Sequence, residues 1–179
     1  MTKQTEALVE EVYDMTTTSN WDGVIEMLKP YVASEPENHW FQSMTGIAYY
    51  HKSDVDNAYH YIEAGLRQKS DCPMGLWLMA NMLNDRGETQ RAAGLWEMIA
   101  AMDPNDKEVE VSCLCCNWET MGRTLVADSK LMLAVAYDKM GYKELAKQYR
   151  NGYLKAMSTG VRSMVDQEKV RAWLLKGQA

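Results

Sequence analysis

The sequence predicts an all-α fold in which helices pair as hairpins and the hairpins stack into a solenoid. The first reason is an internal repeat, since small and apolar residues recur at an interval of 34 within residues 40–104. The second is that turn residues recur at the same interval, as Ser53-Asp54 and Gly87-Glu88 do. The third is that apolar residues follow helical spacing along most of the chain. The matched residues are Gly46, Tyr49, Ala58 and Ile62 in one block, and Ala80, Leu83, Ala92 and Trp96 in the next.

Two helices are expected before the clearest part of the repeat. Residues 6–17 place their apolar side chains at helical spacing and end in a polar run. Residues 21–32 form the second helix. In its last turn, Pro30 is expected to cause a kink or an early end near Lys29, because proline has no N–H to donate.

The next four helices follow the interval of 34 closely. Pro73 opens one of them, because proline is tolerated in the first turn of a helix. These helices are expected at 39–52, 55–68, 73–86 and 89–102. Counted from Thr5, the repeats are 5–38, 39–72 and 73–106.

The spacing changes after residue 106, and an irregular repeat or repeats are expected over 107–160. One register covers 127–160 and an overlapping one covers 108–141, and the residues fit both. Gly122 is expected to break the helical pattern. The final segment is polar on most of its surface, as expected of a capping helix at the end of a stack. Helices are therefore predicted at 108–121, 124–140, 142–156 and 161–176, which gives about ten in all.

These blocks resemble tetratricopeptide repeats. The family has a small residue midway along the first helix, an aromatic residue three positions later and a small residue in the second helix. Gly46, Tyr49 and Ala58 stand at those positions. The resemblance implies a right-handed superhelix with a concave groove. Hydrophobic residues make up 46% of the chain, an amount that suits one domain over residues 1–179.

The helices that open the second and third repeats carry large apolar residues on two opposite faces. One face packs within the hairpin, and in the tetratricopeptide family the other lines the groove that binds peptides. We therefore expect the chain to bind an apolar or amphipathic segment of a partner protein. Acidic residues at the edges favour basic residues beside that segment. The groove residues are predicted to be Tyr13, Trp40, Met44, Ile47, Tyr50, His51, Met74, Trp77, Leu78 and Asn81.

Two other occupants of this groove stay open: the chain's own later helices, and a second copy of the protein in a self-associating scaffold. The architecture, small size and acidic balance also resemble the repeat-containing chaperones of bacterial type III secretion. Co-chaperones of the family bind a carboxylate through cations in the groove. Apolar residues such as Val9, Met44 and Met74 stand at those positions here, so that function is not expected.

Charge and hydropathy exclude several classes of protein. The net charge is −6, and residues 1–140 alone carry −11, which disfavours nucleic-acid binding because phosphate contacts need a basic surface. The chain begins without the apolar run of a secretory signal, and no apolar run approaches the about 20 residues of a membrane span. We therefore expect a cytoplasmic protein without membrane insertion.

The cysteines are the main candidates for redox or metal chemistry. Cys113, Cys115 and Cys116 form a CxxC, but the acidic residues before it raise the thiol pKa and zinc would need further ligands nearby. Packing between helices is the favoured explanation, and a small redox or metal protein is the alternative. The sequence has no phosphate-binding glycine loop, HExxH or GxSxG, so no enzyme and no cofactor are expected.

Overall fold

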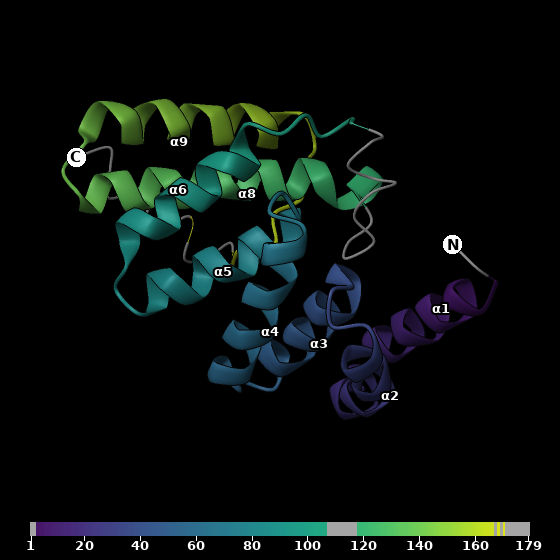
Figure 1. Cartoon of the computed structure of the whole chain (residues 1–179). Coiled ribbons are helices and arrows are strands. Elements are labelled where there is room, and N and C mark those ends of the chain that lie inside the picture. The colour runs from purple at the N-terminus through teal and green to yellow at the C-terminus, as the bar shows by residue number, and fades with distance from the viewer. Residues whose placement is uncertain (1–2, 107–117, 167, 169, 171–179) are drawn as a thin grey trace. The chain divides into compact units, whose positions relative to one another are not determined.

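The described part of the chain is helical (Figure 1). The computed structural model describes residues 3–106, 118–166, 168 and 170, which contain eight helices and no strand, against the ten helices predicted. Most of the helix predicted at 108–121, and half of the one predicted at 161–176, lie outside these residues. The chain divides into two compact units, residues 1–82 and 83–179, which we describe separately.

The first unit consists of helical hairpins. It contains α1 (Lys3–Thr17), α2 (Trp21–Ser34), α3 (His39–His51), α4 (Val55–Gln68) and most of α5 (Pro73–Asp85). Helix α2 continues through Pro30, so the predicted early end near Lys29 is wrong. Asn20 caps α2 by accepting from the N–H of Gly23 at 3.1 Å, and Asp54 caps α4 in the same way from Asn57 at 3.2 Å.

The turns between paired helices share one geometry. Ser19, Ser53 and Gly87 have φ values of 55°, 61° and 84°, and they stand 34 residues apart. After α3, the N–H of Ser53 donates to the carbonyl of Tyr50 at 2.9 Å, and that of Asp54 donates to Tyr49 at 3.0 Å. This pair of bonds is the Schellman motif that satisfies the last carbonyls of a helix. The interval of 34 is therefore present in the backbone as well as in the sequence.

We predict that Ser53→Gly raises the free energy of unfolding by about 1 kcal/mol, because a left-handed φ costs a residue with a Cβ roughly that much. Ser53 is exposed, so little packing is lost. Urea denaturation measures the effect, with Ser53→Ala as the control that keeps the Cβ. A gain as large in Ser53→Ala would contradict the explanation.

The crossing of α3 and α4 depends on small residues. A Cβ on Gly46 would lie 2.7 Å from Cγ1 and 2.9 Å from the backbone N of Ile62. Ala58 and Ile62 are themselves fully buried in α4. Short side chains at this crossing allow the two helices to approach, which is what the repeat pattern predicts.

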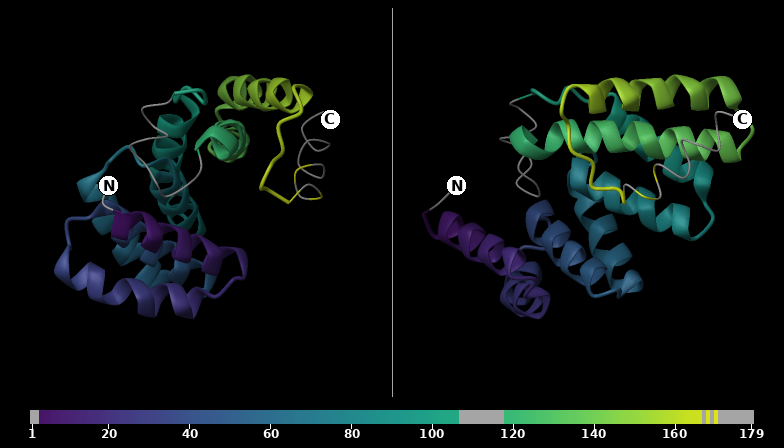
Figure 2. Two further views of the ribbon diagram at one scale, coloured as in Figure 1. Left: turned by 90° about the vertical axis from the view of Figure 1, so that its right-hand side faces the viewer. Right: turned by 180° about the vertical axis from the view of Figure 1, so that it is seen from behind.

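The second unit is formed around α8. It contains α6 (Thr89–Ala100), α8 (Trp118–Lys139) and α9 (Lys143–Ser158), and α8 contacts both of the others. Figure 2 shows α8 and α9 side by side along their lengths. Helix α8 continues through Gly122, so the predicted break at this residue is wrong. Gly122 is buried, and the packing of α8 outweighs the roughly 1 kcal/mol that a glycine costs inside a helix.

The segment after α9 returns over α8. Residues 161–166 are not helical, so the predicted helix does not begin at 161. Asp128 is fully buried in α8 and accepts from the N–H of Met164 at 2.8 Å. Burial raises the pKa of Asp128, against the opposing effect of its hydrogen bonds. Val161, Val165 and Val170 pack on a core that includes Tyr153 of α9. The segment therefore covers one face of the α8–α9 hairpin.

Among the described residues, no helix combines the length and the hydropathy that a membrane crossing requires.

Candidate functional site: an aromatic cleft with one carboxylate

The predicted groove residues fall into two groups. Trp40, Met44, Ile47, Trp77 and Leu78 are buried, and the exposed fraction of each is 8% or less. Tyr13, Tyr50, Met74 and Asn81 are half-buried. His51 is exposed, and its ring stacks on Trp21 with centroids 4.1 Å apart. The largest apolar members of this face are thus covered, and the peptide groove stays a prediction.

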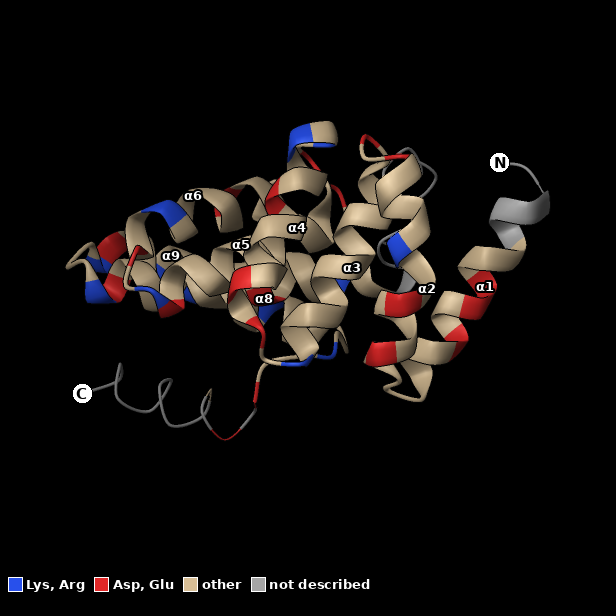
Figure 3. Cartoon of the chain, turned by 60° about the horizontal axis from the view of Figure 1, so that its bottom comes forward, with Lys and Arg blue, Asp and Glu red and all other residues tan. Residues whose placement is uncertain are grey.

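Of the acidic residues expected at the edges of this groove, Glu10 and Asp85 are exposed. Figure 3 shows acidic residues along α1, where Glu10, Glu11 and Asp14 are all exposed. Asp22 on α2 is paired with Lys52 at the end of α3. Negative charge on α1 therefore faces solvent in the first unit.

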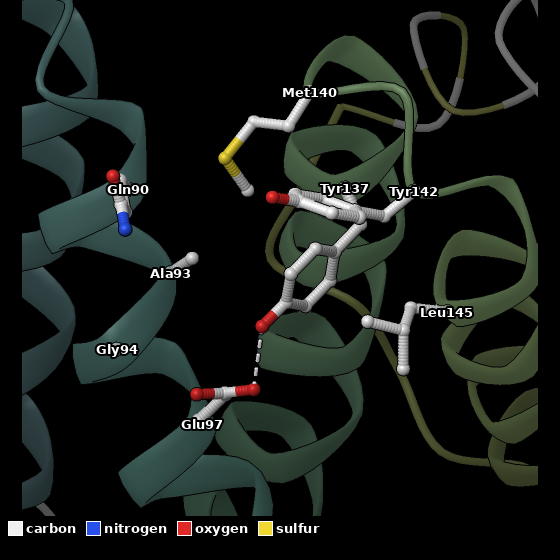
Figure 4. Close-up of a pocket in the computed structure, with 8 residues that line it drawn as sticks. All are labelled: Gln90, Ala93, Gly94, Glu97, Tyr137, Met140, Tyr142 and Leu145. Atoms are coloured by element: carbon white, nitrogen blue, oxygen red, sulfur yellow. Dashed lines mark hydrogen bonds between the residues drawn. The ribbon is translucent and has the colours of Figure 1, made fainter.

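A different concave site lies in the second unit. It is a cleft of about 570 Å³ between α6, the end of α8 and the start of α9 (Figure 4). Such a volume is within the range of small-ligand sites. Tyr142 and Leu145 stand at its edge and are exposed, Tyr142 by 57%. We call it the α6–α8 cleft. Its lining residues are Gln90, Ala93, Gly94, Glu97, Tyr137, Met140, Tyr142 and Leu145.

The polar centre of the α6–α8 cleft is Glu97. The hydroxyl of Tyr137 donates to Oε1 of Glu97 at 2.6 Å, and the hydroxyl of Tyr149 donates to the same oxygen at 3.4 Å. The pKa of Tyr137 is raised, first by burial and then by the hydrogen bond and charge of Glu97. The same causes raise the pKa of Tyr149. Both phenols therefore stay neutral donors at physiological pH, and they hold the carboxylate in place.

The turn between α8 and α9 brings the aromatic residues together. Gly141 has a φ of 85°, and the N–H of Tyr142 donates to the carbonyl of Tyr137 at 2.9 Å. The rings of Tyr137 and Tyr142 meet edge to face, with centroids 5.9 Å apart and planes at 78°. Tyr149 stacks on Tyr137 at 5.7 Å and 8°. The same hydrogen-bonded turn that joins the helices of the other hairpins thus brings the two rings into edge-to-face contact.

A matching tyrosine pair occurs in the first unit. Tyr49 and Tyr61 stack with centroids 5.4 Å apart and planes at 5°. Tyr137 and Tyr149 stand 88 residues later than these two, which is the offset between residues 39–72 and the register at 127–160. The α8–α9 hairpin therefore follows the 127–160 register. A sequence search at this offset would have found the pair, whereas a search at 34 does not.

Each tyrosine pair lies beside a cavity, and the charged residue that lines the cavity differs between the two units. Lys29 lines a cavity of about 90 Å³ beside Tyr49 and Tyr61. Glu97 stands two intervals of 34 after Lys29 and lines the larger cleft. Ile25 of the small cavity likewise corresponds to Ala93. The α6–α8 cleft therefore has alanine where the small cavity has isoleucine, and a carboxylate where the small cavity has an ammonium group.

The predicted cysteine cluster cannot be placed, because Cys113, Cys115 and Cys116 lie outside the described residues. Cys72 is a free, buried thiol. Within residues 3–106 and 118–166, no three His, Cys, Asp or Glu side chains are arranged to hold a metal ion.

Comparison with known proteins finds similar chains among the solved structures. No protein-family model and no curated protein sequence matches the chain. The crystal structure of MamA is similar with a TM-score of 0.45 and 14% sequence identity, over 82% of this chain and 94% of that chain.

Proposed function

We propose that this chain is a protein-interaction module, an adaptor, chaperone or scaffold that binds a segment of a partner protein. The observation that carries the proposal is the α6–α8 cleft, which is open to solvent and lined by aromatic side chains. Tyrosine is enriched among residues that dominate binding energy at interfaces. Tyr142, just before α9, and Leu145, in its first turn, extend this surface as exposed apolar residues.

The predicted groove on α3 and α5 enters this proposal through its accessible members. Tyr50, Met74 and Asn81 would contact the apolar or amphipathic partner segment, and the acidic residues of α1 would favour basic residues beside it. Trp77→Ala does not test this groove, because Trp77 is buried and its loss would change folding first.

Site-specific photo-crosslinking in the source cells tests the proposal. A photoreactive amino acid replaces Tyr142 at the edge of the cleft, and in a control protein it replaces Val55. Val55 is exposed at the start of α4 and corresponds in its hairpin to Lys143. We expect a partner protein to be crosslinked from position 142 and not from position 55. Crosslinking only to a second copy from position 142 would favour the self-associating scaffold, and no crosslink would contradict both.

A further inference from the structure

We propose that the α6–α8 cleft binds the ammonium group of a lysine side chain in the partner segment. This inference rests on the proposed function and names the chemistry of its site. It is based on three features of the cleft: a carboxylate without a cation, a corner of two aromatic rings, and open space above a glycine.

The carboxylate of Glu97 is held in place but not neutralised. Both tyrosine hydroxyls donate to Oε1, which leaves Oε2 for a ligand. No lysine or arginine of the described residues forms an ion pair with Glu97, whereas nearby Lys143 pairs with Asp138 at 2.8 Å and Arg91 pairs with Glu88. A fixed carboxylate that lacks a counterion favours a positively charged ligand.

The aromatic corner adds a second attraction for a cation. The rings of Tyr137 and Tyr142 meet edge to face, and Tyr149 stacks on one face of Tyr137. Aromatic faces carry partial negative charge, and an ammonium group is attracted to a ring face within about 6 Å of its centroid. Figure 4 shows both rings on the side of the cleft opposite α6, with Glu97 below them. Aromatic faces and one carboxylate are the groups that an alkylammonium ion requires.

The open space beside Gly94 is where the alkyl chain of the partner's lysine would lie. It stands inside α6, where alanine would be more stable, and a Cβ built on it meets no atom within 4 Å. Packing of the fold therefore does not require glycine here. Since Gly94 lines the cleft, its missing side chain leaves room for a ligand to approach the helix closely.

The single available oxygen favours lysine over arginine. Arginine gains most from a carboxylate when two parallel N–H groups meet both oxygens. Here Oε1 already accepts two hydroxyls, so one oxygen remains. An ammonium group acts as a compact charge and needs only one acceptor.

The test is an NMR titration of the whole chain with three short peptides that differ at one central residue: lysine, norleucine or arginine. Shifts of the Gly94 and Tyr142 amides report binding up to about 5 mM peptide, which covers low-millimolar Kd values. We expect the lysine peptide to bind at least about tenfold more tightly than the norleucine peptide, and more tightly than the arginine peptide.

Glu97→Gln removes the charge but keeps an oxygen for the Tyr137 hydroxyl, and we expect it to weaken lysine-peptide binding about tenfold. The matched control is Glu63→Gln, one interval of 34 earlier, which should leave binding unchanged. Equal binding of the norleucine peptide, no saturable shift with lysine, or an unchanged Kd in Glu97→Gln would each overturn the inference. If the crosslinked partner binds equally well to the wild type and Glu97→Gln, this inference fails while the proposed function stands.

Discussion

Trp96→Ala is expected to lower the free energy of unfolding by about 3–5 kcal/mol, the usual cost of removing a buried indole. Trp96 stands in α6 and is the largest fully buried side chain among the residues that the structure describes. It occupies the position of Ile62 one interval of 34 earlier, which is also fully buried. Because the side chain at this position is fully buried in both helices, its truncation leaves a cavity rather than a surface change.

Urea unfolding followed by far-ultraviolet circular dichroism measures this effect, since the signal does not depend on the tryptophan removed. Trp96→Phe is the control, because it keeps most of the apolar volume and should cost considerably less than Trp96→Ala. A loss below about 1 kcal/mol in Trp96→Ala would be typical of a surface site and would contradict the burial of this position.

Two glycine-to-alanine changes are expected to act in opposite directions. Gly46→Ala places a Cβ against the side chain and backbone of Ile62, so we expect a loss of about 1–3 kcal/mol from overpacking. Gly94→Ala places a Cβ in open space inside α6, so we expect a gain of about 0.5–1 kcal/mol from helix propensity.

Each variant is the control for the other, because both make the same chemical change in a helix. Urea unfolding of the two proteins against the wild type provides the comparison. If both variants were stabilised, the close crossing of α3 and α4 at Gly46 would be wrong. If both were destabilised, Gly94 would have a packing role and its open space would be in doubt.

The sequence predicts the first six helices well for a physical reason. Starts at Trp21, Val55 and Thr89 follow the interval of 34, because each is preceded by a polar capping position and a turn with positive φ. These capping and turn residues are neighbours of the helix start in sequence, so they can be recognised without knowing which helices pack together. The predicted break at Gly122 is wrong because burial within α8 decides the helix, and the predicted early end near Lys29 is wrong because α2 tolerates the hydrogen bond lost at Pro30.

The cleft could not be predicted in the same way. Helical periodicity identified Trp40 and Trp77 as a second apolar face, but periodicity does not say what covers a face. Glu97 and Tyr137 are 40 residues apart, and neither forms a motif with its neighbours in sequence. Their contact depends on the irregular hairpin at 127–160. This hairpin is offset from the other repeats by a distance that is not a multiple of 34.

If a partner occupies the open space of the α6–α8 cleft, a side chain that fills this space must weaken binding. The most direct test is the Kd of the partner crosslinked at position 142 for the wild type and for Gly94→Leu, measured beside the stability of both proteins. The leucine side chain would fill the cleft where the fold has no contact. We expect Gly94→Leu to be at least as stable as the wild type and to bind the partner at least about tenfold more weakly. An unchanged Kd in a stably folded Gly94→Leu would contradict it.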